Sequence, residues 1–116
     1  MERCCLVTKN HEGKEVIFTE KQRLSHLLKH PELRDSKFID GRVRRAIESP
    51  DFIYQDLAEP KERQALYIKE FCINGITRYT KVVILIIRNP YIVKTAFRPD
   101  YVKERGKTQL LYGKDE

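Results

Sequence analysis

The sequence predicts an α+β fold in which an N-terminal hairpin and two helices pack on an antiparallel sheet of about four strands. Three observations lead to this prediction. Apolar residues recur at helical spacing in two segments between residues 20 and 48. After residue 52 the pattern changes to short alternating or continuous apolar runs, which is typical of strands. Turn-forming residues separate these runs, and short connections favour antiparallel neighbours.

The length of 116 residues suits one compact domain, which we take as 1–116. We expect its core between about residues 16 and 97. Residues 98–116 are basic and polar, and they are predicted to form an irregular tail or a short terminal element.

The chain begins with two β-prone runs, residues 3–8 and 14–19, around a polar connection from Asn10 to Gly13. This arrangement predicts a hairpin.

The first helix is predicted over residues 20–30, with Thr19 as its N-cap and Pro31 at its end. One stripe of the helix is apolar, and it consists of Leu24, Leu27 and Leu28. His26 and His30, four residues apart, lie on a different face. His30 is expected at the C-terminal end of the helix, where the macrodipole would favour its cationic form and raise its pKa.

A second helix is predicted over residues 36–48, with Ser36 as a cap candidate and Pro50 beyond its end. Its apolar positions have roughly helical spacing and are Phe38, Ile39, Val43, Ala46 and Ile47. Arg42, Arg44 and Arg45 cover a wide arc of the other faces, since consecutive helical residues are 100° apart. The simplest interpretation of this arc is a solvated surface.

Four strands follow, around residues 52–54, 66–68, 82–87 and 91–93. Asn74-Gly75 forms a tight-turn signal between the second and third, and Asn89-Pro90 separates the last two. The longest apolar run, residues 82–87, is far too short to span a bilayer. We therefore expect no membrane association through a spanning segment.

The charge and cysteine content indicate the class of partner and the compartment. The formal net charge of +6 favours polyanionic partners, with nucleic acid as the leading candidate. The three cysteines, Cys4, Cys5 and Cys72, form no CxxC pattern and no even set, which favours a reducing compartment. Since no secretory signal is apparent at the N-terminus, we expect a cytoplasmic protein.

Several polar residues supply the groups that metal-free RNA cleavage requires. Such a reaction needs a proton acceptor, a proton donor, and cations or hydroxyls that stabilise the phosphorane. Candidates for these roles are His26, His30, Lys69 and Thr95. Substrate-binding candidates are Tyr67, which could stack on a base, and the helix arginines Arg44 and Arg45. Each of these residues also has an ordinary structural explanation as a cap, a core aromatic or a surface residue.

A zinc site is an alternative use of the histidine pair, because two imidazoles four apart on a helix can bind one ion. However, the sequence His-Leu-Leu-Lys-His lacks the glutamate of the metalloprotease motif, and no clear third ligand is present. We therefore predict no metal and no other cofactor.

The order of several short segments resembles that of the phage-associated barnase–EndoU–colicin–RelE-like (BECR) nuclease domains. The matching segments are Arg-Leu-Ser-His-Leu-Leu-Lys-His-Pro-Glu-Leu at 23–33, Ala-Ile-Glu-Ser-Pro-Asp-Phe-Ile at 46–53, Leu-Tyr-Ile-Lys at 66–69 and Ile-Val-Lys-Thr-Ala-Phe at 92–97. The resemblance extends from about Val16 to Phe97.

This resemblance implies a metal-independent ribonuclease, in which a helical histidine and a hydroxyl on the last strand act on the phosphate. On matching positions it assigns His26 as base or acid, His30 as its companion, Lys69 as the phosphate-facing cation and Thr95 as the strand hydroxyl. Domains of this superfamily occur in phage structural polyproteins and as toxin modules, so an inhibitor or antitoxin protein is a further candidate partner. Two other hypotheses remain open: a non-catalytic RNA-binding or protein-interaction module on the same fold, and a small zinc enzyme.

Overall fold

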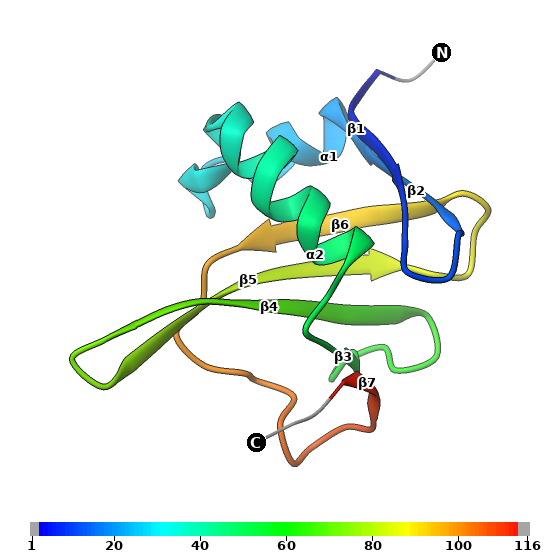
Figure 1. Cartoon of the computed structure of the whole chain (residues 1–116). Helices are drawn as coiled ribbons and strands as arrows, with labels where there is room; N and C mark the ends of the chain where they lie inside the picture. Colours follow the sequence, from blue (N-terminus) through cyan, green and yellow to red (C-terminus); the bar gives the residue numbers. More distant parts are fainter. Residues whose placement is uncertain (1–2, 114–116) are drawn as a thin grey trace.

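The structure is a computed structural model that describes residues 3–113. Seven strands form one mixed sheet in the order β1-β2-β6-β5-β4-β3-β7, with the helical segments on one face (Figure 1). The strands are β1 (Cys4–Lys9), β2 (Glu15–Thr19), β3 (Phe52–Gln55), β4 (Arg63–Ile73), β5 (Ile76–Leu85), β6 (Tyr91–Phe97) and β7 (Leu110–Gly113). The helical segments are α1 (Glu20–Ser25), the 3₁₀ helix η1 (Pro31–Arg34), the π-helical η2 (Phe38–Val43) and α2 (Arg44–Glu48).

The predicted architecture was wrong in the size and type of its sheet and in the extent of its helices. Strand β2 pairs with β6 in parallel, so the N-terminal hairpin extends the sheet instead of packing on it. At the other edge β7 pairs with β3. The four predicted strand segments correspond to β3 to β6, although the predicted segment 82–87 extends two residues beyond β5. These strands pair with one another antiparallel in the middle of the sheet.

The first helix is also shorter than the predicted 20–30. Thr19 is its N-cap, and its hydroxyl accepts a hydrogen bond from the Gln22 amide at 3.1 Å. The helix ends at Ser25, and residues 26–30 form turns. Pro31 then starts η1, at a helical position where its missing N–H costs nothing. His30 therefore precedes a helix instead of closing one.

The helices bury their apolar side chains against one face of the sheet. Val43, Ala46 and Ile47 are fully buried. They belong to one core cluster with the sheet residues Phe18, Leu66, Ile68, Val82, Ile84 and Val93. Because side chains alternate along a strand, the intervening residues point to the opposite face.

The opposite face carries a second core, built from aromatic residues. Phe52, Tyr54, Tyr67 and Tyr79 pack with ring centroids 5.4 to 6.4 Å apart, mostly edge to face. The C-terminal segment covers them and contributes Val102. The residues predicted as an irregular tail thus complete a hydrophobic layer, although among residues 98–113 only β7 is a regular element.

A buried carboxylate fixes that segment to the sheet. Glu104 is fully buried, and it accepts hydrogen bonds from the Tyr67 hydroxyl and from Lys81 Nζ, the latter at 2.8 Å. Lys81 is itself buried and lies 5.5 Å from the centroid of the Tyr67 ring. Burial, followed by the hydrogen bond to Glu104, raises the pKa of Tyr67, so the phenol remains a donor.

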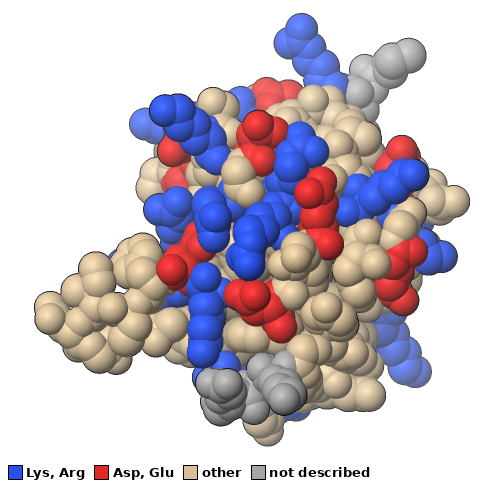
Figure 2. All heavy atoms as spheres, viewed as in Figure 1, with Lys and Arg blue, Asp and Glu red and all other residues tan. Residues whose placement is uncertain are grey.

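The β4–β5 hairpin projects beyond the rest of the sheet. Strand β3 pairs with β4 only up to Tyr67, and β6 pairs with β5 only as far back as Lys81. The hairpin closes at Asn74-Gly75, both at positive φ (52° and 77°), as predicted for a tight turn. Residues 71–77 carry no charge, and the projection is visible as an uncharged lobe in Figure 2.

No helix within residues 3–113 has both the length and the apolar composition that crossing a bilayer would require.

Replacing Glu104 by alanine should destabilise the fold by about 3–5 kcal/mol, because Lys81 would remain buried without its counter-ion. Urea unfolding at pH 7 measures the change. The exposed Glu59→Ala variant is the control and should stay within about 0.5 kcal/mol of the unsubstituted protein. A loss below about 1 kcal/mol for Glu104→Ala would contradict the proposed role of the pair.

Candidate active site

The free edge of β6 determines where the histidines lie. Strand β2 pairs with β6 only at Tyr91 and Ile92. Residues after β2 cover the rest of that edge: the Gln22 side chain donates to Lys94 O at 2.7 Å, and the Glu32 carboxylate accepts from the Arg98 amide at 3.0 Å. The histidine turn, residues 26–30, therefore lies alongside β6.

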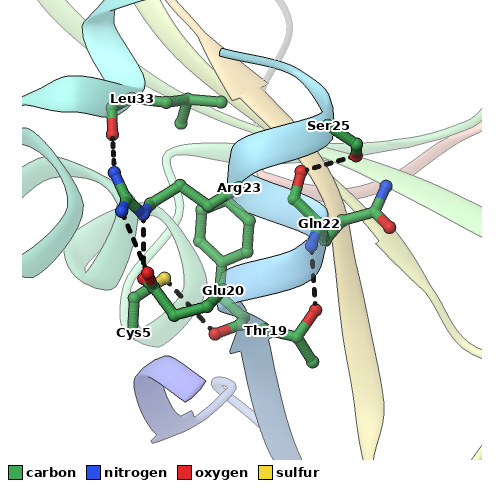
Figure 3. A network of polar contacts seen from close by, with 8 residues as sticks. Cys5, Thr19, Glu20, Gln22, Arg23, Ser25 and Leu33 are labelled. Carbon is green, nitrogen blue, oxygen red and sulfur yellow. Dashed lines mark hydrogen bonds and ion pairs between the residues drawn. The ribbon is translucent and has the colours of Figure 1, made fainter. Parts of the chain in front are cut away.

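A polar network holds the two ends of this turn together. The Arg23 guanidinium donates to both carboxylate oxygens of Glu20, at 2.8 and 3.0 Å, and to Leu33 O at 2.9 Å (Figure 3). The last bond connects α1 to η1 across the histidine turn. Next to it, Cys5 Sγ donates to Phe18 O, and burial raises the pKa of Cys5 to about 11. This thiol is therefore not a nucleophile at neutral pH.

Both histidines line a cleft of about 460 Å³ on the sheet face opposite α2. Its floor consists of side chains from β5 and β6 that alternate with the helix-facing core residues, including Lys81, Val83, Thr95 and Phe97. The His30 ring stacks on Phe97, with centroids 4.4 Å apart and planes 8° apart. The orientation of this imidazole is thus fixed by packing.

The cleft is cationic. Five basic side chains line it: Lys29, Arg63, Lys81, Lys94 and Lys103. The cleft also has two acidic residues, and both already accept hydrogen bonds from other groups of the protein. Asp56 accepts from the amides of Ala58 and Glu59, while Glu104 binds Lys81 and Tyr67. The remaining positive charge suits a phosphate-bearing ligand.

Burial and these cations keep both imidazoles neutral. The pKa of His26 is lowered by burial, then by the charges of Lys94 and Lys29. The pKa of His30 is lowered chiefly by burial, although the Glu32 carboxylate opposes the shift. The predicted increase for His30 was wrong, because the helix ends at Ser25 and provides no carbonyl terminus next to His30.

Two donors in the cleft wall have no protein partner. Within the described residues, nothing hydrogen-bonds Thr95 Oγ1 or Arg63 Nε, although both atoms are buried. Leaving such a group unsatisfied costs about 1–3 kcal/mol, and buried polar atoms without a partner are rare in folded proteins. Their neighbours cover both atoms, so a ligand reaches them only if those side chains shift.

Three of the predicted catalytic residues therefore come together in this cleft, namely His26, His30 and Thr95. Lys69 does not. It lies on the same face of β4 as Tyr67, but two residues closer to the turn of the β4–β5 hairpin. Its backbone amide donates to the Asp51 carboxylate at 2.7 Å. The cation at the cleft floor is instead Lys81, which pairs with Tyr67 across the strands.

The predicted substrate-binding residues lie elsewhere. The side chain of Tyr67 is fully buried in the second core, so it cannot stack on a base. Arg44 and Arg45 lie on α2, on the other side of the sheet. Arg44 is paired with Asp40 at 2.7 Å, and Arg45 lies 3.6 Å from Asp51. Figure 2 shows acidic and basic residues interleaved over this surface, as in a solvated helix face.

Sequence reasoning missed Gln22, Arg63, Lys81 and Lys94. Strand alternation places Lys81 on the same face as Val83, but the apolar run at 82–87 concealed the polar start of that strand. Lys94 lies at an irregularity in the β5–β6 register, which no sequence pattern indicates. Gln22 can be recognised as a residue of the site only from its contacts in the folded structure.

Within residues 3–113, no three His, Cys, Asp or Glu side chains form a group suited to a metal ion. The zinc hypothesis thus finds no third ligand there. The cysteines Cys4, Cys5 and Cys72 are free thiols.

Comparison with known proteins provides no family model, curated protein or solved structure that matches the chain. The function of the cleft is therefore inferred from its own geometry.

The lowered pKa values predict that His26 and His30 titrate below about 6.5, the value of an unperturbed histidine. NMR titration of their ring protons checks this. The two histidines bind protons more readily in the unfolded chain than in the folded one. The free energy of unfolding should therefore be at its full value above about pH 6.5 and decrease as the pH falls below it. In the double variant His26→Gln/His30→Gln, the decrease in stability that these two histidines cause at low pH should be smaller. A midpoint above 6.5 for either ring would contradict the prediction.

Proposed function

We propose that the protein is a metal-independent endoribonuclease acting at this cleft. One observation carries the proposal: two neutral imidazoles, a strand hydroxyl and several cations share one cleft. These are the groups that intramolecular cleavage of an RNA phosphodiester uses. The resemblance to BECR nuclease domains is an additional motive for the proposal.

In the proposed reaction the ribose 2′-oxygen attacks the adjacent phosphorus. The O2′–P bond forms and the P–O5′ bond breaks, giving a 2′,3′-cyclic phosphate and a free 5′-hydroxyl. An imidazole accepts the 2′-hydroxyl proton, and the 5′-oxygen takes a proton from a protonated imidazole or from water. The substrate itself supplies the nucleophile, so no metal-bound water is needed.

His30 is the better candidate for the base. Its ring is fixed on Phe97, and neither ring nitrogen has a hydrogen-bond partner within the described residues. One nitrogen of His26 is already bonded to Gln22. Lys94 and Arg63 are placed to neutralise the phosphate, and Thr95 to donate to one of its oxygens once the covering side chains shift. As part of the same proposal, the protein acts in the cytoplasm, as a phage-associated or toxin module with a possible protein inhibitor.

A second candidate is RNA binding without cleavage on the same surface. The observation that favours it is the lowered pKa of both histidines, which disfavours the imidazolium that would protonate the leaving oxygen. The cleft cations would still bind phosphates. This candidate predicts salt-sensitive binding with no product.

Cleavage by His30→Ala should decrease by about 100-fold or more, the usual contribution of a positioned acid–base group. His26→Ala should also lower cleavage, because it removes the second imidazole of the cleft. Mixed RNA incubated with EDTA, followed by end-group analysis, measures both the rate and the predicted cyclic phosphate. Lys69→Ala should retain cleavage, whereas Lys94→Ala should lose much of it, because Lys94 lines the cleft and Lys69 does not. Full cleavage by His26→Ala and His30→Ala, or none by the unsubstituted protein, would exclude this mechanism.

The pH profile provides a separate test of the base. Since burial lowers the pKa of His30, kcat/KM should remain high at pH 6.5 and decrease only at lower pH, with a midpoint below about 6.5. A midpoint at or above 7 would indicate that another group accepts the proton.

A further inference from the structure

The Gln22 side chain connects His26 to strand β6. Its amide nitrogen, Nε2, lies 2.7 Å from Lys94 O and 2.9 Å from His26 Nε2. Figure 3 shows this side chain directed away from the Arg23–Glu20 pair. The Gln22 backbone is fixed as well, since its N–H donates to the Thr19 cap.

The Lys94 contact determines the orientation of the Gln22 amide. A backbone carbonyl oxygen only accepts hydrogen bonds, so the Gln22 atom facing it must be the NH₂ nitrogen. The reversed amide would place two oxygens against each other. This nitrogen is a donor only, with two N–H groups, and its second partner is His26 Nε2. The imidazole nitrogen must therefore accept, which means that it carries no proton.

We propose that Gln22 is a positioning residue that holds His26 in the neutral tautomer protonated on Nδ1. Free histidine favours the other tautomer, with the proton on Nε2. The groups whose charges act on His26 are Lys29 and Lys94, and both also disfavour the imidazolium. Protonating Nε2 would direct an N–H toward an N–H and break the contact with Gln22.

The chemical consequence rests on the proposed ribonuclease function. A neutral His26 whose Nε2 is occupied acts as neither acid nor base. It remains a hydrogen-bond donor through Nδ1, suited to an oxygen of the phosphorane, as a neutral imidazole can be when its pKa is lowered. His30 is then the proton acceptor, so the two histidines have different roles that their sequence spacing does not reveal.

Long-range ¹H–¹⁵N NMR of the imidazole nitrogens tests the assignment without any RNA. In the unsubstituted protein at pH 7.5, His26 should show the pattern of an Nδ1-protonated ring. In Gln22→Met, which keeps the length but removes the donor, the pattern should shift toward Nε2 protonation. The His26 pKa should increase by about 0.5–1 unit, the equivalent of one lost hydrogen bond.

The exposed Gln109→Met variant is the matched control and should leave both properties unchanged. An Nε2-protonated His26 in the unsubstituted protein would overturn the proposal, and so would an unchanged tautomer and pKa in Gln22→Met. The first spectrum needs no variant, so a misfolded Gln22→Met would not leave the question open. Absence of RNA cleavage would refute the proposed function while leaving the tautomer result intact. In an active enzyme, Gln22→Met should lower kcat more than it changes KM.

Discussion

The buried carboxylate of Glu104 is the interaction on which one whole face of the sheet depends. It joins three parts of the chain, since Tyr67 lies on β4, Lys81 on β5 and Glu104 in the C-terminal segment. A buried ion pair adds little net stability, because desolvation offsets the attraction, but it strongly penalises arrangements that leave one charge unpaired. The C-terminal segment is therefore restricted to one position, over the aromatic core. That position also fixes Lys81 in the floor of the cleft.

The cleft arises from an incomplete strand pairing. Because β2 follows β6 for only a short distance, the remaining edge of β6 is left to Gln22 and the turn after α1. The histidines therefore reach the opposite face from α2, where burial and surrounding cations keep them neutral. By contrast, the arginines of α2 are paired with nearby carboxylates on the surface. The positive charge that a ligand could reach lies in the cleft, where the acidic residues already have other hydrogen-bond partners. A count of basic residues in the sequence does not show this.

The sequence predicted local features well. The Thr19 cap and the Asn74-Gly75 turn are confirmed, since each depends on a few adjacent residues. The structure brings His26, His30 and Thr95 into one cleft and leaves Lys69 outside it, and the roles of these residues remain proposals.

The errors concern relations between distant segments. Parallel pairing of β2 with β6 depends on contacts that no local pattern encodes, and it joins the N-terminal hairpin to the sheet. Strand alternation puts Lys69 and Tyr67 on one face, but it does not show which end of a strand lies in a cleft and which part is covered by later residues. Lys81 and Glu104 could not be recognised as partners, because burial made their pairing important and burial is a property of the complete fold.

The cleft combines residues from early and late in the chain, and this has a consequence during synthesis. The histidine turn emerges from the ribosome well before β6, along which it lies, and before Glu104, which fixes the floor. The imidazoles have no strand hydroxyl beside them until β6 has emerged, and Lys81 has no buried partner until residue 104 has emerged. The groups that line the cleft are thus not assembled in a growing polypeptide until residue 104 has been added.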